Sequence, residues 1–329
     1  MKTAVFSAKP YDRAFLAAGS AAAGHELVFV ENRLRADTVG LAAGCLAVCV
    51  FVNDVLDAEV LGGLAALGVR FVALRCAGYN NVDLGAAREL GMRVARVPSY
   101  SPHAVAEHAV ALLLGLNRHI PRAGARVRDG NFSIDGLMGR DLHGKTVGVI
   151  GTGNIGGIFA GILLGFGCRV LAYDIRRDAE LEGRGVVYAP LREVLENSFF
   201  LSLHCPLVAA TRHLLNAETF AWLPRGALVV NTSRGALIAA DDAIAAIKSG
   251  HLGGLALDVY EEEAELFFED HSSDIIQDDT FARLVSFPNV LVTSHQAFFT
   301  QEAMENIAAT TMGNLSDFAG GRVGANAVN

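Results

Sequence analysis

A glycine-rich turn between an apolar strand and a helix constrains this chain more than any other segment. The apolar run Val147 to Ile150 leads directly into a G-x-G-x-x-G pattern, formed by Gly151, Thr152, Gly153, Asn154, Ile155 and Gly156. In this pattern the first glycine permits a tight turn, the second lets the backbone approach a pyrophosphate and the third lets the helix pack closely on the strand. The N-terminus of the helix offers free N–H groups and the positive end of its dipole to phosphates. The segment therefore predicts a dinucleotide-binding unit.

A second apolar strand follows this helix and ends on Asp174, 23 positions after Gly151. That is near the spacing of about 20 residues expected for a carboxylate that binds the ribose hydroxyls. The same segment resembles a membrane span, because Thr146 to Cys168 contains no charged residue and glycine recurs every fourth position from Gly153 to Gly165. We reject that interpretation because the segment holds eight glycines and begins as a strand and a turn.

Length and composition are typical of a two-domain α/β enzyme. The chain has 329 residues, of which 52% are apolar and 19% charged, enough for large cores and too apolar for disorder. The net charge of −8 and the lack of a basic run argue against binding to nucleic acid. We expect no signal peptide and no membrane partner, because the N-terminal residues contain no long apolar stretch. Five cysteines without a C-x-x-C pair predict reduced thiols in a cytoplasmic protein.

Short apolar runs alternate with helical segments, which predicts parallel sheets. In the first hundred residues, strands are expected at Ala4 to Phe6, Glu26 to Val30, Cys45 to Val52, Arg70 to Leu74 and Arg93 to Val97, and helices at Val60 to Leu67 and Leu84 to Leu90. Ser101 and Pro102 then begin a long apolar helix that runs to Pro121. After Asp174, strands are expected at Phe199 to His204, Ala227 to Asn231, Gly254 to Val259 and Val290 to Ser294, and a last helix at Gln301 to Phe318.

The glycine-rich turn lies in the middle of the chain, so a complete domain's worth of sequence precedes it. We therefore predict an α/β fold of two Rossmann-like, doubly wound parallel-sheet domains with a cleft between them. Residues 1–100 and 299–329 form a discontinuous substrate-binding domain, and residues 101–298 form the dinucleotide-binding domain. The cleft is the default active site.

Ligands of open parallel sheets bind beyond the carboxyl ends of the strands, so charged residues that directly follow apolar runs are candidates for chemistry. Arg234 follows one such run, Asp258 and the glutamates Glu261, Glu262 and Glu263 follow a second, and His295 follows a third. Charged loop residues are usually solvated, but three strand ends in one dinucleotide-binding domain favour a site.

These residue types suit hydride transfer to a 2-keto acid. Arg234 can hold a carboxylate and polarise a keto oxygen, because its guanidinium is permanently charged and fork-shaped. His295 can give a proton to the alcohol oxygen, because histidine titrates near neutral pH. A nearby glutamate would orient the ring and favour its protonated form. The residues alone do not choose among the three glutamates.

Two other kinds of site are less favoured. Cys205 follows His204 and could form a nucleophile pair with it, but a strand-end cysteine packed near the cofactor is the better interpretation. His103, His108 and His119 fall along one predicted helix without a carboxylate or cysteine in ligand spacing, so no metal site is expected.

Several segments together resemble the D-2-hydroxyacid dehydrogenase family, and within it the fermentative D-lactate dehydrogenases. The resemblance covers nearly the whole chain and is carried by LRCAGYNNVDL, VPSYSPHAVAEHA, GKTVGVIGTGNIG, LSLHCPL, NTSRGAL, LDVYEEEAELFFED and HQAFFT. It implies an NADH-dependent, reversible reduction of pyruvate to D-lactate, and the D-stereochemistry rests on it alone. The family pattern DVxxxE selects Glu263 as the partner of His295, and the family's arginine falls on Arg234.

The resemblance also implies binding residues. Asn154 and Ile155 would lie in the phosphate turn, and Asp174 would bind the adenosine ribose of NAD. The other residues implied at the cofactor are His204, Cys205, Pro206, Thr211, Thr232, Ser233 and Asp258. On the substrate side, the backbone N–H groups of Gly78 and Tyr79 would bind the carboxylate next to Arg75, and Tyr100 and Phe298 would form pocket walls. A homo-oligomer, dimer or tetramer, is expected.

Two alternatives stay open. The substrate could be another small 2-keto acid, such as phenylpyruvate, a branched-chain keto acid or hydroxypyruvate. The chain could instead be a dinucleotide-sensing binding protein like the family's corepressors, although the intact Arg234, Glu263 and His295 set argues against this. Arg176 and Arg177 follow Asp174 and could receive a 2′-phosphate, so the preference for NAD over NADP is less certain than Asp174 alone would make it.

Overall fold

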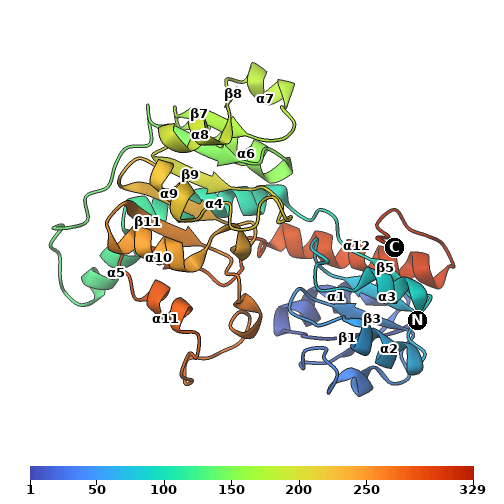
Figure 1. The fold of residues 1–329 in the computed structure, drawn as a ribbon. Coiled ribbons are helices and arrows are strands. Elements are labelled where there is room, and N and C mark those ends of the chain that lie inside the picture. Colours follow the sequence, from blue (N-terminus) through green and yellow to red (C-terminus); the bar gives the residue numbers. More distant parts are fainter. The chain divides into compact units, whose positions relative to one another are not determined.

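The computed structural model describes residues 1–329, apart from the side chains of Ala22 and Glu265. The chain divides into two compact units. Unit 1 consists of Met1–Ser101 and Phe299–Asn329, and unit 2 consists of Pro102–Phe298. The chain passes from unit 1 to unit 2 after Ser101 and returns to unit 1 after Phe298. The sequence predicts these boundaries after residues 100 and 298. Figure 1 shows the helices and strands of each unit.

Unit 1 contains a five-stranded sheet in the order β2-β1-β3-β4-β5, and every neighbouring pair is parallel. Its strands are β1 (Lys2–Val5), β2 (Glu26–Phe29), β3 (Ala47–Val50), β4 (Phe71–Leu74) and β5 (Arg93–Ala95). Its helices are α1 (Pro10–Ala23), η1 (Val39–Ala42), α2 (Ala58–Ala66), α3 (Leu84–Glu89) and the C-terminal α12 (Gln301–Ala319).

The C-terminal helix α12 is part of the core of unit 1. Met312 and Leu315 of α12 pack with Leu16 of α1 and Phe71 of β4 in one buried cluster. The rings of Phe71 and Phe318 are stacked with their centroids 4.2 Å apart. The two ends of the chain therefore fold into one body.

Unit 2 contains a seven-stranded sheet in the order β12-β11-β10-β9-β6-β7-β8, again parallel throughout. Its strands are β6 (Thr146–Ile150), β7 (Arg169–Tyr173), β8 (Val187–Tyr188), β9 (Phe200–Leu203), β10 (Ala227–Asn231), β11 (Leu252–Leu257) and β12 (Val290–Val292). Its helices are α4 (Pro102–Asn117), α5 (Ile120–Arg128), α6 (Asn154–Gly165), α7 (Ala179–Gly183), α8 (Leu191–Asn197), α9 (Ala217–Trp222), η2 (Gly235–Leu237), α10 (Ala240–Lys248), η3 (Glu263–Glu265) and α11 (Asp279–Val285).

Both faces of this sheet are covered by helices, which is why its strands are apolar throughout rather than alternating. Val147 and Val149 pack into the cluster formed with α4 and α6. Ile150 packs into the other cluster, formed with α8, α9, α10 and α11. The predicted α/β class with two parallel sheets is confirmed.

The predicted long helix to Pro121 is wrong at its C-terminal end. Helix α4 ends at Asn117, and His119 adopts a left-handed conformation with φ 52° as the N-cap of the separate helix α5. Pro121 then lies in the first turn of α5, where a missing N–H costs no hydrogen bond. His119 therefore does not share a helix with His103 and His108.

The glycine-rich segment is a strand, a turn and the 12-residue helix α6, as the motif predicts. Within the part of the chain that the structure describes, no helix is both long and apolar enough to cross a membrane.

Candidate active site

The turn between β6 and α6 has the backbone geometry that its glycines require. Gly151 adopts φ +90°, and a Cβ there would meet the backbone of His204 and Cys205. A Cβ on Gly156 would collide with the carbonyl oxygen of Gly151, so this helix can approach the strand only without a side chain. At Gly153, a Cβ would have nothing within 4 Å. The turn is therefore closed on the protein side and open where a phosphate would bind.

Helix α6 begins with its first N–H groups unused by a cap. Its N-cap is Gly153, which has no side chain to accept a hydrogen bond from Asn154 or the residues after it. These groups and the helix dipole can therefore bind a pyrophosphate. Asn154 and Ile155 occupy the first two positions of the helix.

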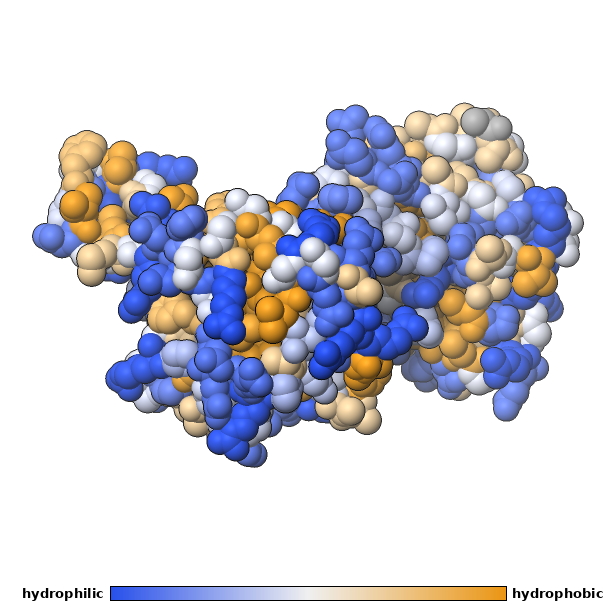
Figure 2. Space-filling model, turned by 90° about the horizontal axis from the view of Figure 1, so that it is seen from above, coloured by the Kyte–Doolittle hydropathy of each residue, from blue (hydrophilic) through white to orange (hydrophobic). Residues whose placement is uncertain are grey.

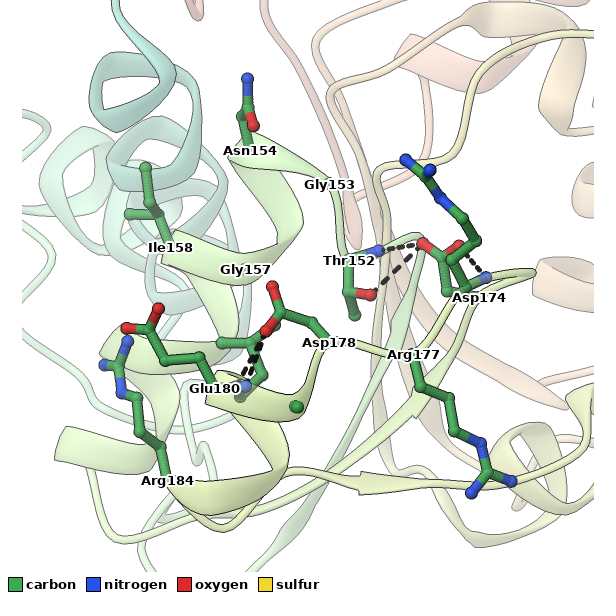
Figure 3. A pocket seen from close by; sticks show the side chains of 13 residues that line it. Thr152, Gly153, Asn154, Gly157, Ile158, Asp174, Arg177, Asp178, Glu180 and Arg184 are labelled. Carbon is green, nitrogen blue, oxygen red and sulfur yellow. Dashed lines mark hydrogen bonds between the residues drawn. The ribbon is translucent and has the colours of Figure 1, made fainter.

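Asp174 lies at the end of β7 and faces the glycine turn (Figure 3). Its carboxylate accepts hydrogen bonds from the N–H groups of Thr152, at 2.6 Å, and Arg176, at 2.9 Å. Partial burial would raise the pKa of Asp174, but these hydrogen bonds outweigh it and hold the pKa below its usual value. The carboxylate is therefore an anion at the mouth of a cavity of about 720 Å³ that the glycine turn also lines.

The arginines after Asp174 line the same cavity. Figure 3 shows the side chain of Arg177 extending away from Asp174, and its Nη1 lies 3.8 Å from Glu182 Oε1. Both side chains of that pair are exposed, so the contact is weak. Arg177 is therefore not fixed as a phosphate ligand.

The residues after β9 lie behind the glycine turn. His204 Nε2 is 2.9 Å from Ser202 Oγ, and burial lowers the pKa of His204 far below its ordinary value, so the ring is neutral. Burial raises the pKa of the Cys205 thiol to about 11. A neutral imidazole and a protonated thiol do not form a nucleophile pair, which favours the packing interpretation of Cys205.

The loop that follows is held by its own hydrogen bonds. Thr211 Oγ1 donates to the carbonyl oxygen of Pro206 at 2.7 Å and accepts from Val208 N at 2.9 Å. Ser233 Oγ, from the loop after β10, donates to the carbonyl oxygen of Cys205 at 2.7 Å. Pro206, Thr211 and Ser233 are thus parts of one hydrogen-bonded edge.

The loop after β10 is organised by a residue that the sequence did not single out. Asn231 is fully buried; its Oδ1 accepts from Ser233 N at 3.0 Å and its Nδ2 donates to the Arg234 carbonyl oxygen at 2.9 Å. Arg234 Nη1 donates to the Ser233 carbonyl oxygen at 2.7 Å. Thr232 is 7% exposed, and its Oγ1 has no hydrogen-bond partner among the described residues. That unused hydroxyl fits a site for a polar ligand group.

Glu263 forms a hydrogen bond with His295. Glu263 Oε1 lies 2.7 Å from His295 Nδ1, and its Oε2 accepts from the backbone N–H of Tyr260 at 2.8 Å. Glu261 instead pairs with Arg212 and His213. Because Nδ1 is taken by the glutamate, Nε2 is the ring atom left for another partner. The sequence alone left open which of the three glutamates contacts His295, and in the structure Glu263 does so.

Asp258 anchors the loop that carries His295. The residue is completely buried at the end of β11, and its backbone carbonyl accepts from His295 N at 2.7 Å. Burial would raise the pKa of Asp258, but hydrogen bonds from His108, Thr293 and the backbone lower it, and the net pKa lies below its usual value. The carboxylate is therefore a buried anion.

The Arg75 side chain is held inside unit 1, and its Nη1 has no hydrogen-bond partner among the described residues, so the contact with substrate stays a prediction. The side chain is 2% exposed; Nε is 3.1 Å from Asp12 Oδ1, and Nη2 donates to the carbonyl oxygen of Ser7 at 2.9 Å. Its guanidinium lies over the Phe51 ring, 4.9 Å from the centroid. Arg75 therefore binds α1 and the loop after β1 to the end of β4.

The other residues predicted to bind substrate are Gly78, Tyr79, Tyr100 and Phe298, and they differ in how far they are exposed to solvent. Tyr79 is 37% exposed with Arg96 over its ring, and the Gly78 carbonyl oxygen accepts from Cys76 Sγ. The carbonyl oxygen of Tyr100 accepts from Asn306 Nδ2 at 2.8 Å. Phe298, the last residue of unit 2, is 7% exposed.

Comparison with known proteins agrees with this geometry. Residues 110–297 match the family described as D-isomer specific 2-hydroxyacid dehydrogenase, NAD binding domain. The chain is 51% identical to the D-lactate dehydrogenase of Escherichia coli and 51% identical to a 2-hydroxyacid dehydrogenase homolog of Zymomonas mobilis, each over 98% of both chains. The apo structure of D-lactate dehydrogenase from Escherichia coli superposes with a TM-score of 0.92 at 47% identity, covering 100% of both chains. The predicted family and the predicted cofactor, NAD, are confirmed.

We expect NADH to be used better than NADPH, because the Asp174 carboxylate would accept the ribose hydroxyls and repel a 2′-phosphate. Replacing Asp174 with Ala should narrow this preference by weakening NADH use and sparing NADPH use. The measurement is kcat/KM for each cofactor in both proteins. Equal or better use of NADPH by the unmodified protein would contradict the expectation and implicate Arg176 and Arg177 as phosphate ligands.

Proposed function

We propose that this chain, which belongs to the D-isomer specific 2-hydroxyacid dehydrogenase family and is an NAD-dependent enzyme, reduces pyruvate to D-lactate and catalyses the reverse reaction. The observation that carries the proposal is the 2.7 Å contact between Glu263 Oε1 and His295 Nδ1. It fixes one ring nitrogen and leaves the other for the oxygen of a substrate. The relative of similar length in Escherichia coli is named a D-lactate dehydrogenase, which supports pyruvate among small 2-keto acids.

His295 is the proton donor in reduction. NADH, held by the glycine turn and Asp174, would supply the hydride to the keto carbon. The protonated ring gives its Nε2 proton to the oxygen that becomes the hydroxyl, and in oxidation the neutral ring takes it back. Glu263 balances the positive ring and holds its orientation, because the backbone N–H of Tyr260 fixes the second carboxylate oxygen.

Arg234 holds the keto acid. Its backbone is clamped by Asn231, and its guanidinium is only partly buried, so charged N–H donors remain for a carboxylate or a keto oxygen. In unit 1, the backbone N–H groups of Gly78 and Tyr79 bind the substrate carboxylate. Tyr100 and Phe298 limit the side chain of the substrate to about the size of a methyl group.

The chain forms a homo-oligomer through an exposed apolar segment of unit 2. On α5 and the loop after it, several large side chains face solvent: Ile120 is 60%, Val127 53%, Phe132 76%, Ile134 81% and Met138 91% exposed. Figure 2 shows apolar side chains gathered on a projecting part of the surface at its left edge. A contiguous patch of this kind marks a protein interface, and a second copy of the chain is the proposed partner. All five cysteines are buried and none forms a disulfide within the described residues, which supports a reducing compartment, the cytoplasm; cell fractionation would check this.

Among 2-keto acids, pyruvate should have the highest kcat/KM. Phenylpyruvate, ketoisocaproate and hydroxypyruvate should be weaker substrates, although an apolar pocket discriminates by only about 1–3 kcal/mol per methylene. The measurement is steady-state oxidation of NADH over this panel. A larger keto acid that is turned over more efficiently would refute pyruvate as the substrate and leave the family assignment intact.

Loss of the proton donor should slow pyruvate reduction and D-lactate oxidation alike, because both directions pass the same proton through His295 Nε2. Replacing His295 with Ala should lower kcat by about 10²–10⁴ without a large change in NADH binding. In Glu263→Gln, kcat should also fall, because a neutral amide no longer balances the positive ring. The measurement is steady-state kcat together with the affinity for NADH in both variants.

The matched control is Glu262→Gln, which removes a neighbouring exposed carboxylate and should leave kcat unchanged. A near-normal kcat in His295→Ala would contradict the mechanism, and a near-normal kcat in Glu263→Gln would contradict the role of Glu263.

The exposed segment after α4 should control the oligomeric state. Replacing Phe132, Ile134 and Met138 together with Ser should reduce the mass found by sedimentation to that of one chain. These residues are exposed, so the thermal midpoint of a monomer should stay measurable. A variant that sediments like the unmodified protein would exclude this segment as the interface.

A further inference from the structure

A second histidine lies against the buried carboxylate that anchors the loop of His295. His108 comes from α4, and its Nε2 is 3.4 Å from Asp258 Oδ1 and 3.2 Å from Thr293 Oγ1. Its side chain is 19% exposed. Nothing in the mechanism above uses this residue.

The hydrogen bonds around Asp258 fix which atom of His108 carries a proton. Thr293 Oγ1 donates its only proton to Asp258 Oδ1, at 2.6 Å. The same hydroxyl oxygen can then only accept from His108, so Nε2 of His108 must be a donor. Its N–H points at the Thr293 oxygen and the Asp258 oxygen together. This arrangement holds for the neutral ring with the proton on Nε2 and for the charged ring.

The same carboxylate shapes the loop of residues 293–297. Asp258 Oδ1 accepts from Gln296 N and Oδ2 accepts from Ala297 N, both at 2.9 Å. Between Thr293 and Gln296, His295 adopts a left-handed conformation with φ 54°. This conformation is uncommon for a residue with a side chain, so the surrounding contacts must hold it.

We propose that His108 is a positioning residue for His295, acting through Thr293 and Asp258. The inference rests on the proposed role of His295 as proton donor. His108 stabilises the negative charge of the Asp258 carboxylate, which already accepts hydrogen bonds from three other groups. It also fixes the orientation of the Thr293 hydroxyl at the start of the loop. Without it, Asp258 Oδ1 loses a donor and Thr293 can rotate, so the loop that aims the His295 ring becomes less well defined.

The location of His108 explains why α4 is suited to this task. Helix α4 begins at Pro102, where the chain enters unit 2, and the loop of residues 293–297 ends just before Phe298, where the chain leaves it. The contact therefore ties the first helix of unit 2 to its last loop. A shift of α4 relative to β11 is passed to the His295 backbone through two hydrogen bonds.

The test compares His108→Leu, His108→Gln and the matched control His103→Leu, an exposed histidine on the same helix. In His108→Leu, kcat for pyruvate reduction should fall about 10- to 100-fold, the usual effect of misplacing a reacting group by about 1 Å. KM for pyruvate should stay within about twofold, because Arg234, Gly78 and Tyr79, the groups proposed to bind the substrate, are untouched. In His108→Gln, whose amide N–H can replace the Nε2 donor, most of the activity should return.

The outcomes separate this inference from the proposed function. A His108→Leu enzyme with normal kcat, or a loss that appears in KM for pyruvate instead, would overturn the positioning role while His295→Ala still tests the mechanism. A Gln variant as inactive as the Leu variant would also overturn it, because the donor would not be what matters. If the Leu variant does not fold, Thr293→Val removes the same relay, and a normal kcat there would refute the proposal.

Discussion

A carboxylate that is completely removed from water, that of Asp258, obliges the chain around it to supply its hydrogen bonds. An isolated buried anion would be protonated, yet the pKa of Asp258 lies below its usual value, because donors surround it. Those donors come from α4, from Thr293 and from the backbone of the following loop. The hydrogen bonds that the Asp258 carboxylate requires therefore shape the loop of His295 within unit 2, before any ligand binds.

Unit 1 uses a related arrangement at the same edge of its own sheet. Asp54, 1% exposed after β3, accepts hydrogen bonds from Ser7 Oγ and from the N–H groups of Leu34 and Phe51. Here burial dominates and raises the pKa of Asp54. Each unit thus holds a buried aspartate among the loops at the carboxyl edge of its sheet, and the direction of the pKa shift reflects how far the hydrogen bonds to each carboxylate offset its burial.

The sequence predicts well what depends on local pattern. The strands of both sheets, the glycine turn and the last helix lie within a few residues of their predicted positions, because apolar runs and capping residues act over short distances. Helix α1 and strand β8 were not predicted; β8 is only two residues long and gives too short a pattern to detect. The break between α4 and α5 was missed because it depends on the left-handed backbone of His119 rather than on composition.

Contacts between distant segments are harder to predict. The ion pair of Arg75 with Asp12 could not be predicted, because the two residues lie 63 positions apart in the sequence. The three adjacent glutamates are indistinguishable in sequence, and only the fold directs Glu261 to Arg212 and Glu263 to His295. Asn231 and His108 have their effect through buried hydrogen bonds, which leave no pattern in the sequence.

The discontinuous construction of unit 1 has a consequence for synthesis on the ribosome. Unit 2 is one continuous segment and can fold as soon as it has emerged, whereas β1 to β5 must wait for α12 to cover Leu16 and Phe71. The residues made first are therefore completed last, and at about 5–20 residues per second the open sheet persists for roughly ten seconds or more. During that interval the apolar face that α12 will cover is exposed to chaperones and to neighbouring nascent chains.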